Sequence, residues 1–166
     1  MGRYRPPTKP GSQYITPEGN KCLQDELDYL WNKLRPEVTR AVTAAAAEGD
    51  RSENAEYIYR KKQLREIDSR VRFLRKRLEG MIVVSQIPDN IDAVYFGAWV
   101  ELEDIDGNAL IIRIVGPDEI DPKLSYISMD SPMGQALLGK KLDDEFTLKL
   151  PNGEINYCIV NINYKS

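Results

Sequence analysis

Apolar residues recur at helical spacing through the first third of the chain. Successive members lie 4, 3, 4, 4, 4 and 3 residues apart, at Leu23, Leu27, Leu30, Leu34, Val38, Val42 and Ala45. Such spacing places one apolar stripe along a helix and is close to the heptad pattern of a coiled coil. It predicts a helix over about residues 17–47. Pro36 should kink or interrupt this helix, because proline lacks the N–H that an interior turn needs.

A second stripe predicts a helix over about residues 52–79, from Tyr57, Leu64, Ile67, Val71, Leu74 and Leu78. Gly49 can end the first helix, since glycine adopts the left-handed cap conformation readily. Ser52 can cap the second helix by accepting a backbone N–H. Two helices with so short a connection fold back antiparallel. We therefore expect a coiled-coil hairpin over residues 14–81, with helices roughly 40–45 Å long at 1.5 Å per residue.

The hydrophobic period changes to two in the second half of the chain, which favours β-strands. The pair Asn152-Gly153 between apolar runs is typical of a tight hairpin, and Ser131-Pro132 is typical of a helix start. The pattern predicts strands over 98–103, 110–115, 126–129, 146–150 and 155–164, and a helix over 132–138. The expected fold class is α+β, with a leader (1–13), the hairpin (14–81), a linker (82–92) and a small antiparallel-sheet domain (93–166).

Composition narrows the possible functions. Hydrophobic residues make up 42% and charged residues 30% of the chain, and no apolar run approaches the length of a membrane span. The N-terminus lacks the apolar core of a secretory signal, so we expect a cytoplasmic protein without a membrane partner. The sequence has no histidine and only two cysteines, Cys22 and Cys158. This argues against a zinc site and against a histidine-based catalytic triad.

Charge is divided unevenly between the two halves. Residues 1–85 carry 17 Lys and Arg against 12 Asp and Glu, whereas residues 86–166 carry 6 against 14. Much of the positive charge lies on the predicted second helix, where Arg60 falls in the apolar stripe and four cations share one side: Lys61, Arg65, Arg72 and Lys76. These cations could form a solvated flank with ion pairs, which the residues alone favour, or a surface that follows a phosphate backbone.

The turn of the hairpin carries two acidic residues, Asp50 and Glu53. They could simply solubilise the turn, and Glu53 could interact favourably with the N-terminal end of the second helix. A third interpretation is a metal site, but two carboxylates are too few to hold Mg²⁺ unaided. They would need a site that already supplies carboxylates and a phosphodiester, as in two-metal hydrolysis. Spacing alone favours the structural interpretations.

Several motifs occur in the order found in one bacterial family. The run GDRSENAEY at 49–57 resembles the tip of the Gre transcript-cleavage factors, and RPEVT at 35–39 and LREID at 64–68 resemble GreB-like members. FGAWVE at 96–101 and DSPM at 130–133 continue the resemblance into the second half. The resemblance covers about residues 14–164 and leaves the leader outside.

This resemblance implies a transcription elongation factor that is not itself an enzyme. Its coiled coil would enter the secondary channel of bacterial RNA polymerase and stimulate the polymerase's own cleavage of backtracked RNA. Asp50 would stabilise a Mg²⁺ shared with the polymerase, with no cofactor held stably by the free chain, and Glu53 would position the attacking water. The nascent RNA 3′ end would contact Arg60, Lys61, Arg65, Arg72 and Lys76. An FKBP-like C-terminal domain would dock on the polymerase through Asp118, Glu119, Ile120, Ser131, Pro132 and Met133.

Three alternatives stay open. The same scaffold could occupy the channel and inhibit transcription without stimulating cleavage, although its tip acids are intact. An FKBP-like domain could be a prolyl isomerase, whose pocket would need several of the aromatic residues Tyr95, Phe96, Trp99, Tyr126, Phe146, Tyr157 and Tyr164. The heptads could join two chains in an adaptor, but the two stripes of one chain can pair with each other, so a monomer is expected.

Overall fold

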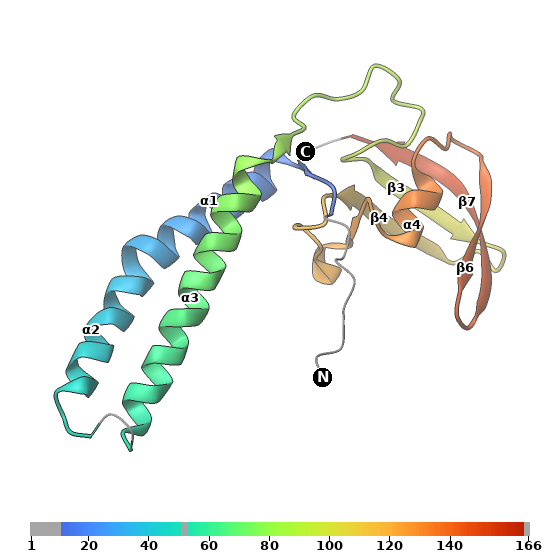
Figure 1. The fold of residues 1–166 in the computed structure, drawn as a ribbon. Helices are drawn as coiled ribbons and strands as arrows, with labels where there is room; N and C mark the ends of the chain where they lie inside the picture. Colours follow the sequence, from blue (N-terminus) through green and yellow to red (C-terminus); the bar gives the residue numbers. More distant parts are fainter. Residues whose placement is uncertain (1–10, 51–52, 165–166) are drawn as a thin grey trace, which may run out of the picture. The chain divides into compact units, whose positions relative to one another are not determined.

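The computed structural model describes residues 11–50 and 53–164, which form two compact units (Figure 1). The helical unit spans Glu18–Met81, and within the described residues the sheet unit joins residues 11–17 with residues 82–164. Sequence reasoning assigned residues 14–17 to the hairpin and 82–92 to a linker, whereas the structure includes both stretches in the sheet unit. None of the helices within the described ranges is long and apolar enough to cross a membrane.

The helical unit is an antiparallel hairpin, as predicted. Its first arm consists of α1 (Pro17–Tyr29), the π-helical segment η1 (Leu30–Leu34) and α2 (Arg35–Ala46), and its second arm is α3 (Ala55–Glu79). Figure 1 shows the two arms side by side. The apolar spacing identified the buried face of both arms, because the core contains members of both stripes: Val38, Ile67 and Val71, flanked by the half-buried Leu27, Leu30, Leu34, Val42 and Leu64.

The π-helical segment explains how Pro36 is accommodated. Proline cannot donate to the carbonyl four residues back, and its ring presses against that carbonyl in a regular α-helix. In η1 the Arg35 N–H instead donates to Leu30 O, five residues back, and the wider turn takes up an extra residue. Four residues make slightly more than one α-helical turn, so apolar residues four apart drift around the helix axis. The extra residue in the wider turn removes this drift, and Leu30, Leu34 and Val38 all pack in the same core. The predicted interruption therefore lies just before the proline.

The sheet unit is built on five strands in the order β5-β4-β3-β7-β6. They are β3 (Trp99–Asp104), β4 (Ala109–Val115), β5 (Tyr126–Ser128), β6 (Glu145–Leu150) and β7 (Gly153–Asn163). The other pairings are antiparallel, but β5 runs parallel to β4, which corrects the prediction of an antiparallel sheet at this edge. The connection between these strands includes the 3₁₀ helix η2 (Pro122–Leu124) and returns the chain to Arg113, so that β5 pairs with the last three residues of β4.

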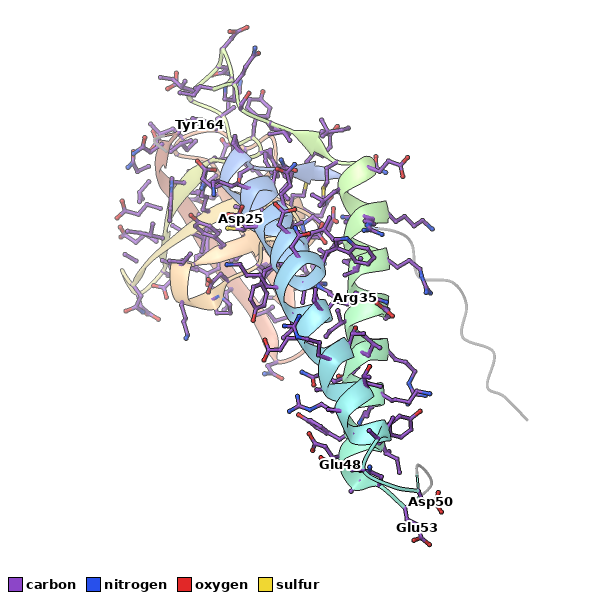
Figure 2. The ribbon with its side chains drawn as sticks, turned by 90° about the vertical axis from the view of Figure 1, so that its left-hand side faces the viewer. Asp25, Arg35, Glu48, Asp50, Glu53 and Tyr164 are labelled. Atoms are coloured by element: carbon purple, nitrogen blue, oxygen red, sulfur yellow. The ribbon has the colours of Figure 1, made fainter. Side chains whose placement is uncertain are left out.

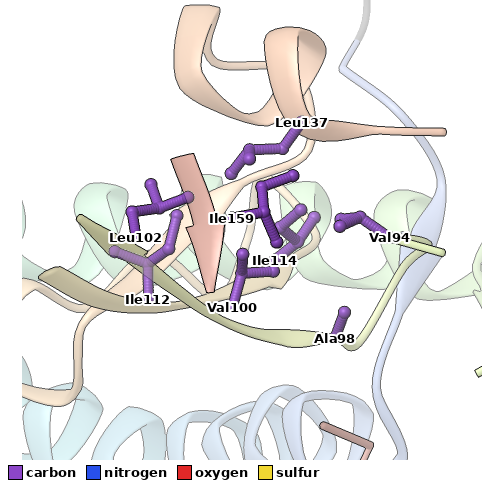
Figure 3. Packing of buried hydrophobic residues seen from close by; sticks show 8 residues of the cluster. All are labelled: Val94, Ala98, Val100, Leu102, Ile112, Ile114, Leu137 and Ile159. Carbon is purple, nitrogen blue, oxygen red and sulfur yellow. The ribbon is translucent and has the colours of Figure 1, made fainter. Parts of the chain in front are cut away.

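One face of this sheet packs against the short helix α4 (Pro132–Leu137). Figure 3 shows Leu137 of the helix directed toward strand residues that include Ile114 and Ile159. A fully buried aliphatic side chain of this size contributes roughly 1.5–3 kcal/mol, so the cluster is a main source of stability for the unit. Its buried members are each 4% exposed or less: Val94, Ala98, Val100, Leu102, Ile112, Ile114, Leu137 and Ile159.

A separate parallel pair of strands ties the start of the described chain to the sheet unit. It joins β1 (Tyr14–Ile15) to β2 (Ile82–Val83). The Ile82 N–H donates to the carbonyl of residue 13 at 2.8 Å. One residue before residue 13, the Ser12 N–H donates to the Asp130 carboxylate at 2.9 Å. The end of the predicted flexible leader is therefore bonded to the sheet unit, while residues 1–10 lie outside the described residues.

Candidate functional site

The far end of the helical unit presents three carboxylates to solvent. Between α2 and α3, Gly49 adopts a φ of 146°, a conformation that suits glycine and strains other residues. Figure 2 shows Glu48, Asp50 and Glu53 in this turn, and all three are exposed. The acidic residues identified in the sequence therefore lie at the extremity of the hairpin.

Asn54 holds the two arms together at this turn. Its side-chain oxygen accepts the Tyr57 N–H at 3.0 Å and so caps α3, while its amide nitrogen donates to Ala45 O at 2.7 Å, close to the end of α2. The predicted cap, Ser52, lies outside the described residues. The helix starts later than predicted because Asn54 is its cap. The Asn54 side chain thus accepts a hydrogen bond from an N–H of α3 and donates one to a carbonyl of α2. These two bonds fix the acidic turn between the helices.

Replacing Asn54 with alanine should loosen the tip. The variant loses both hydrogen bonds, and loss of an N-cap alone costs about 1 kcal/mol. We expect urea denaturation, followed by the helical circular dichroism signal, to give a free energy of unfolding lower by roughly 1–2 kcal/mol.

Asn54→Asp is the matched control for this prediction. Aspartate keeps the oxygen that caps α3 but lacks the donor to Ala45 O, so its stability should fall between those of the wild type and Asn54→Ala. An alanine variant as stable as the wild type would show that Asn54 does not hold the arms together.

The donor chemistry of the tip suits a hard divalent cation but is incomplete. Carboxylate oxygens are ligands that Mg²⁺ prefers, and Asp50 and Glu53 supply two such groups. No cluster of three or more potential metal-ligating side chains occurs among residues 11–50 and 53–164. The tip can therefore contribute ligands to a cation whose other ligands come from a second molecule.

Four of the five predicted RNA-binding residues share one exposed side of α3. Lys61, Arg65, Arg72 and Lys76 lie within about 60° of one another around the helix axis, at 100° per residue. All four are exposed, and within the described part of the chain none of them forms an ion pair. These four cations, the basic stripe, are therefore not held in ion pairs of the described residues, which favours the phosphate-binding interpretation.

Arg60 does not belong to the basic stripe. Its guanidinium forms an ion pair with Glu56 at 2.8 Å and a hydrogen bond with Gln63 at 3.0 Å. The hydrogen bond to Glu56 raises the pKa of the Arg60 guanidinium above its usual value. Its side chain is only 34% exposed, because it occupies the position in the apolar stripe where the sequence placed it. Arg60 is thus engaged within its own helix and separated from the other four cations.

The predicted docking residues of α4 have roles within the sheet unit. Ser131 accepts the Gly134 N–H at 3.0 Å and caps the helix, and Pro132 follows in the first turn. Met133 packs against the core. In the connection between β4 and β5, by contrast, Ile120 is 56% exposed and offers an apolar surface that a partner could cover.

Glu119 binds within the sheet unit. Its carboxylate accepts hydrogen bonds from the Thr16 N–H at 3.1 Å, from the Thr16 hydroxyl and from the Gly116 N–H at 2.9 Å. Thr16 is buried and immediately precedes α1, and the neighbouring Asp118 is half-buried. Glu119 therefore anchors the chain where it enters the first helix, a role that no sequence pattern indicated.

Replacing Glu119 with alanine should destabilise the sheet unit. Hydrogen bonds to a charged group contribute about 1.5–3 kcal/mol, so we expect chemical denaturation to give a loss of roughly 2–3 kcal/mol. Glu119→Gln is the control, since its oxygen can accept both N–H groups and its amide can donate to the Thr16 hydroxyl. It should retain most of the stability. Unchanged stability in Glu119→Ala would leave the docking role as its main function.

Sequence reasoning missed a cluster of aromatic and arginine side chains in the helical unit. The Trp31 ring lies with its centroid 4.3 Å from the guanidinium carbon of Arg75 and 5.1 Å from that of Arg35. Arg35 also pairs with Asp68 at 2.7 Å. Trp31 borders a surface hollow of about 400 Å³. Because Trp31 and Arg75 lie outside both apolar stripes, hydrophobic spacing did not single them out.

The aromatic residues of the sheet unit are distributed over separate contacts. Trp99 packs against Tyr126 with 5.8 Å between ring centroids, whereas Phe146 lies 5.7 Å from Tyr157. The second pair borders a hollow of about 570 Å³ that is also lined by the carboxylates of Glu103, Asp104 and Glu145. A prolyl isomerase pocket would be lined by several aromatic rings. This hollow has only two and is acidic, so it does not support that alternative.

Two family models of known proteins match successive parts of the chain. The family model described as "Transcription elongation factor, N-terminal" matches residues 13–83, and "Transcription elongation factor, GreA/GreB, C-term" matches residues 88–164. The chain is similar to transcription elongation factor GreB of Pseudomonas aeruginosa, with 58% identity over 164 residues, 99% of this chain and 98% of that protein.

The chain is also similar to a second curated protein and to a solved structure. Transcription elongation factor GreB of Xanthomonas axonopodis is 57% identical over 167 residues, 100% of this chain and 99% of that protein. The crystal structure of GreA factor homolog 1 (Gfh1) of Thermus thermophilus is 25% identical, with 90% of this chain and 97% of that chain covered and a TM-score of 0.41. The chain described here belongs to the GreA/GreB family of transcription elongation factors, in which it is GreB-like.

Proposed function

We propose that this chain inserts its helical hairpin into the secondary channel of bacterial RNA polymerase and stimulates the polymerase to cleave backtracked RNA. The observation that carries the proposal is the exposed pair of carboxylates, Asp50 and Glu53, at the extremity of the hairpin. The Asn54 bridge supports this role, since it fixes the turn from which both acids project. The hydrolytic chemistry belongs to the polymerase, and the chain is not itself an enzyme.

Asp50 would hold a Mg²⁺ that is shared with the polymerase, and Glu53 would orient the attacking water. When bound, the cation would supply the positive charge that activates a water and stabilises a leaving oxygen. The free chain offers too few ligands to retain the ion, so the site forms only in the complex. Both acids lie on a narrow turn that can enter a confined channel, and Asn54 limits their movement once inside.

The basic stripe would hold the extruded 3′ segment of the nascent RNA. From Lys61 to Lys76 it extends roughly 22 Å along α3 at 1.5 Å per residue. Its exposed cations can follow a phosphate backbone without regard to base sequence. Arg60, engaged with Glu56, would support the helix rather than the RNA.

The sheet unit would dock on the polymerase outside the channel. Its half of the sequence is acidic, with 14 Asp and Glu against 6 Lys and Arg in residues 86–166, which suits a basic partner surface. Ile120 would supply an apolar contact there. The apolar stripes are already paired within one chain, so a monomer suffices for function.

The proposal is tested by adding the protein to stalled elongation complexes that contain labelled RNA. Release of short 3′ fragments, followed by renewed elongation, is the expected result. Slower synthesis without cleavage products would instead support the channel-occupying inhibitor. The intact acids at the tip favour the first outcome.

A further inference from the structure

Arg113 lies in a row of side chains that crosses three strands of the sheet. The register places it directly between Trp99 of β3 and Tyr126 of β5. Successive side chains of a strand point to opposite faces, and the neighbouring Ile112 and Ile114 pack in the cluster beside α4. The row therefore lies on the face of the sheet that α4 does not cover.

The guanidinium of Arg113 is held between the two aromatic rings. Its central carbon lies 5.9 Å from the Trp99 ring centroid and 5.4 Å from the Tyr126 ring centroid. Its Nε donates to Gly97 O, and a terminal nitrogen donates to the Tyr126 hydroxyl, each at the long distance of 3.3 Å. A guanidinium has five N–H donors, so these two contacts of the described residues do not saturate it.

The charge of Arg113 has no carboxylate counterpart among the described residues. The composition makes this unexpected, because residues 86–166 carry 14 Asp and Glu and Arg113 is their only arginine. Glu101 shares this face in the next row, opposite Ile111, but forms no ion pair with Arg113. A half-buried cation is normally compensated by an opposite charge, which aromatic rings replace only in part. The guanidinium can therefore gain an acid from another molecule.

The surroundings of Arg113 favour a carboxylate over a phosphate. A carboxylate is planar and accepts two parallel hydrogen bonds from the fork of a guanidinium. A phosphate would bring a second negative charge toward Glu101, and a nucleic acid would bring many more to an acidic unit. Ile111, in the next row, is 53% exposed and offers an apolar contact beside the cation. These features fit an Asp or Glu side chain with an apolar neighbour on a protein surface.

We propose that Arg113, Trp99 and Tyr126 form a receptor for one carboxylate side chain of a partner protein. The choice of partner rests on the function proposed above, since the partner is then an acidic residue on the RNA polymerase surface that receives the sheet unit. The Tyr126 N–H donates to Asp121 O at 3.0 Å, and Asp121 follows Ile120 directly. The receptor therefore continues the docking surface from the apolar contact at Ile120 to a positive centre.

Polymerase binding by full-length variants tests the receptor. Arg113→Gln should weaken the affinity roughly tenfold, and Arg113→Glu roughly a hundredfold, because glutamate repels the partner's carboxylate. Arg113→Lys should give an intermediate loss, since lysine keeps the charge but lacks the fork. Lys149→Gln is the matched control, because Lys149 is an exposed cation of β6 at the other edge of the sheet.

A purely structural arginine gives a different pattern. Arg113→Gln and Arg113→Glu would then lose equal affinity, and added salt would weaken their binding as much as that of the wild type. Under the proposal, Arg113→Gln is less sensitive to salt than the wild type, because it lacks the ion pair. Equal affinities for Arg113→Gln, Arg113→Glu and the wild type, or equal losses in the two variants, overturn the proposal.

The free protein provides a test that does not involve polymerase. Sodium acetate supplies the carboxylate, and sodium chloride at an equal ionic strength of about 0.1 M is the reference. Acetate should shift the NMR signals of the Arg113 Nε–H and the Trp99 indole N–H. The Arg70 Nε–H is the control, because that guanidinium already binds the Glu26 carboxylate at 2.7 and 3.0 Å. No acetate shift at Arg113, or one no larger than at Arg70, overturns the proposal.

The two proposals fail in distinguishable ways. If acetate shifts Arg113 but the wild-type protein binds no polymerase and stimulates no cleavage, the carboxylate receptor stands and the proposed function fails. If the wild-type protein stimulates cleavage but acetate does not shift Arg113, the proposed function stands and the carboxylate receptor fails.

Discussion

Replacing Asp50 with asparagine is expected to abolish stimulated RNA cleavage while leaving polymerase binding unchanged. Asparagine keeps the size of the side chain and one oxygen but removes the negative charge that a divalent cation requires. Asp50 is exposed at the tip, so the substitution creates no buried defect. Removing one group that stabilises charge in a transition state typically slows a reaction about 100- to 1000-fold, and we expect a loss of that order.

The measurement is the rate of fragment release from stalled complexes, together with the affinity of the variant for polymerase in a competition assay. Glu48→Gln is the matched control, because Glu48 is an exposed carboxylate of the same turn with no proposed ligand role. It should behave as the wild type. Cleavage by Asp50→Asn at the wild-type rate would remove the metal role of Asp50, and loss of binding would mean that the tip contributes to docking.

Replacing Gly116 with alanine is expected to detach β1 from the sheet unit. A Cβ built at this position would lie 2.1 Å from Tyr14 O, a backbone atom that cannot rotate away. The clash pushes the β1 backbone outward, and this also separates Thr16 from the Glu119 carboxylate. Overpacking costs about 1–3 kcal/mol, and loss of the Glu119 bonds adds to it, so we expect a destabilisation of roughly 3 kcal/mol or more.

Hydrogen exchange locates the effect of this substitution. The Ile82 and Val84 N–H groups donate to the β1 segment, at 2.8 and 2.9 Å, and should exchange much faster in Gly116→Ala. Val83→Ala is the control, since it shortens an exposed side chain of β2 without touching the β1 backbone. Protection of both amides at the wild-type level would show that β1 adjusts to the extra methyl group without leaving its place.

The regular elements could be predicted from the sequence because each leaves a periodic signal. Steps of three and four marked both arms of the hairpin, and Asn152-Gly153 marked the turn between β6 and β7. The pairing of β1 with β2 left no such signal, since each strand has only two residues and they lie far apart in the chain. The parallel edge was missed for a related reason: alternation identifies a strand but not its direction.

The candidate site could be predicted only in part. Asp50 and Glu53 could be placed because any residue in a short turn between long helices must lie at the end of the hairpin. The choice of Asn54 as cap could not, because Ser52 is an equally good cap by residue type. The Trp31–Arg75 contact joins two arms at positions outside the apolar stripes, so it emerges only when their relative rotation is known.

The π-helical turn at η1 affects the direction in which the side chains at the tip of the hairpin point. In regular α-helix, adding or removing one residue rotates everything beyond it by about 100°, which would swing Asp50 toward a different wall of any enclosing channel. The π-helical turn absorbs one such residue while Leu34 and Val38 keep their places in the core. The extra residue is thereby accommodated near the middle of the first arm, and the acidic turn keeps its orientation about the helix axis.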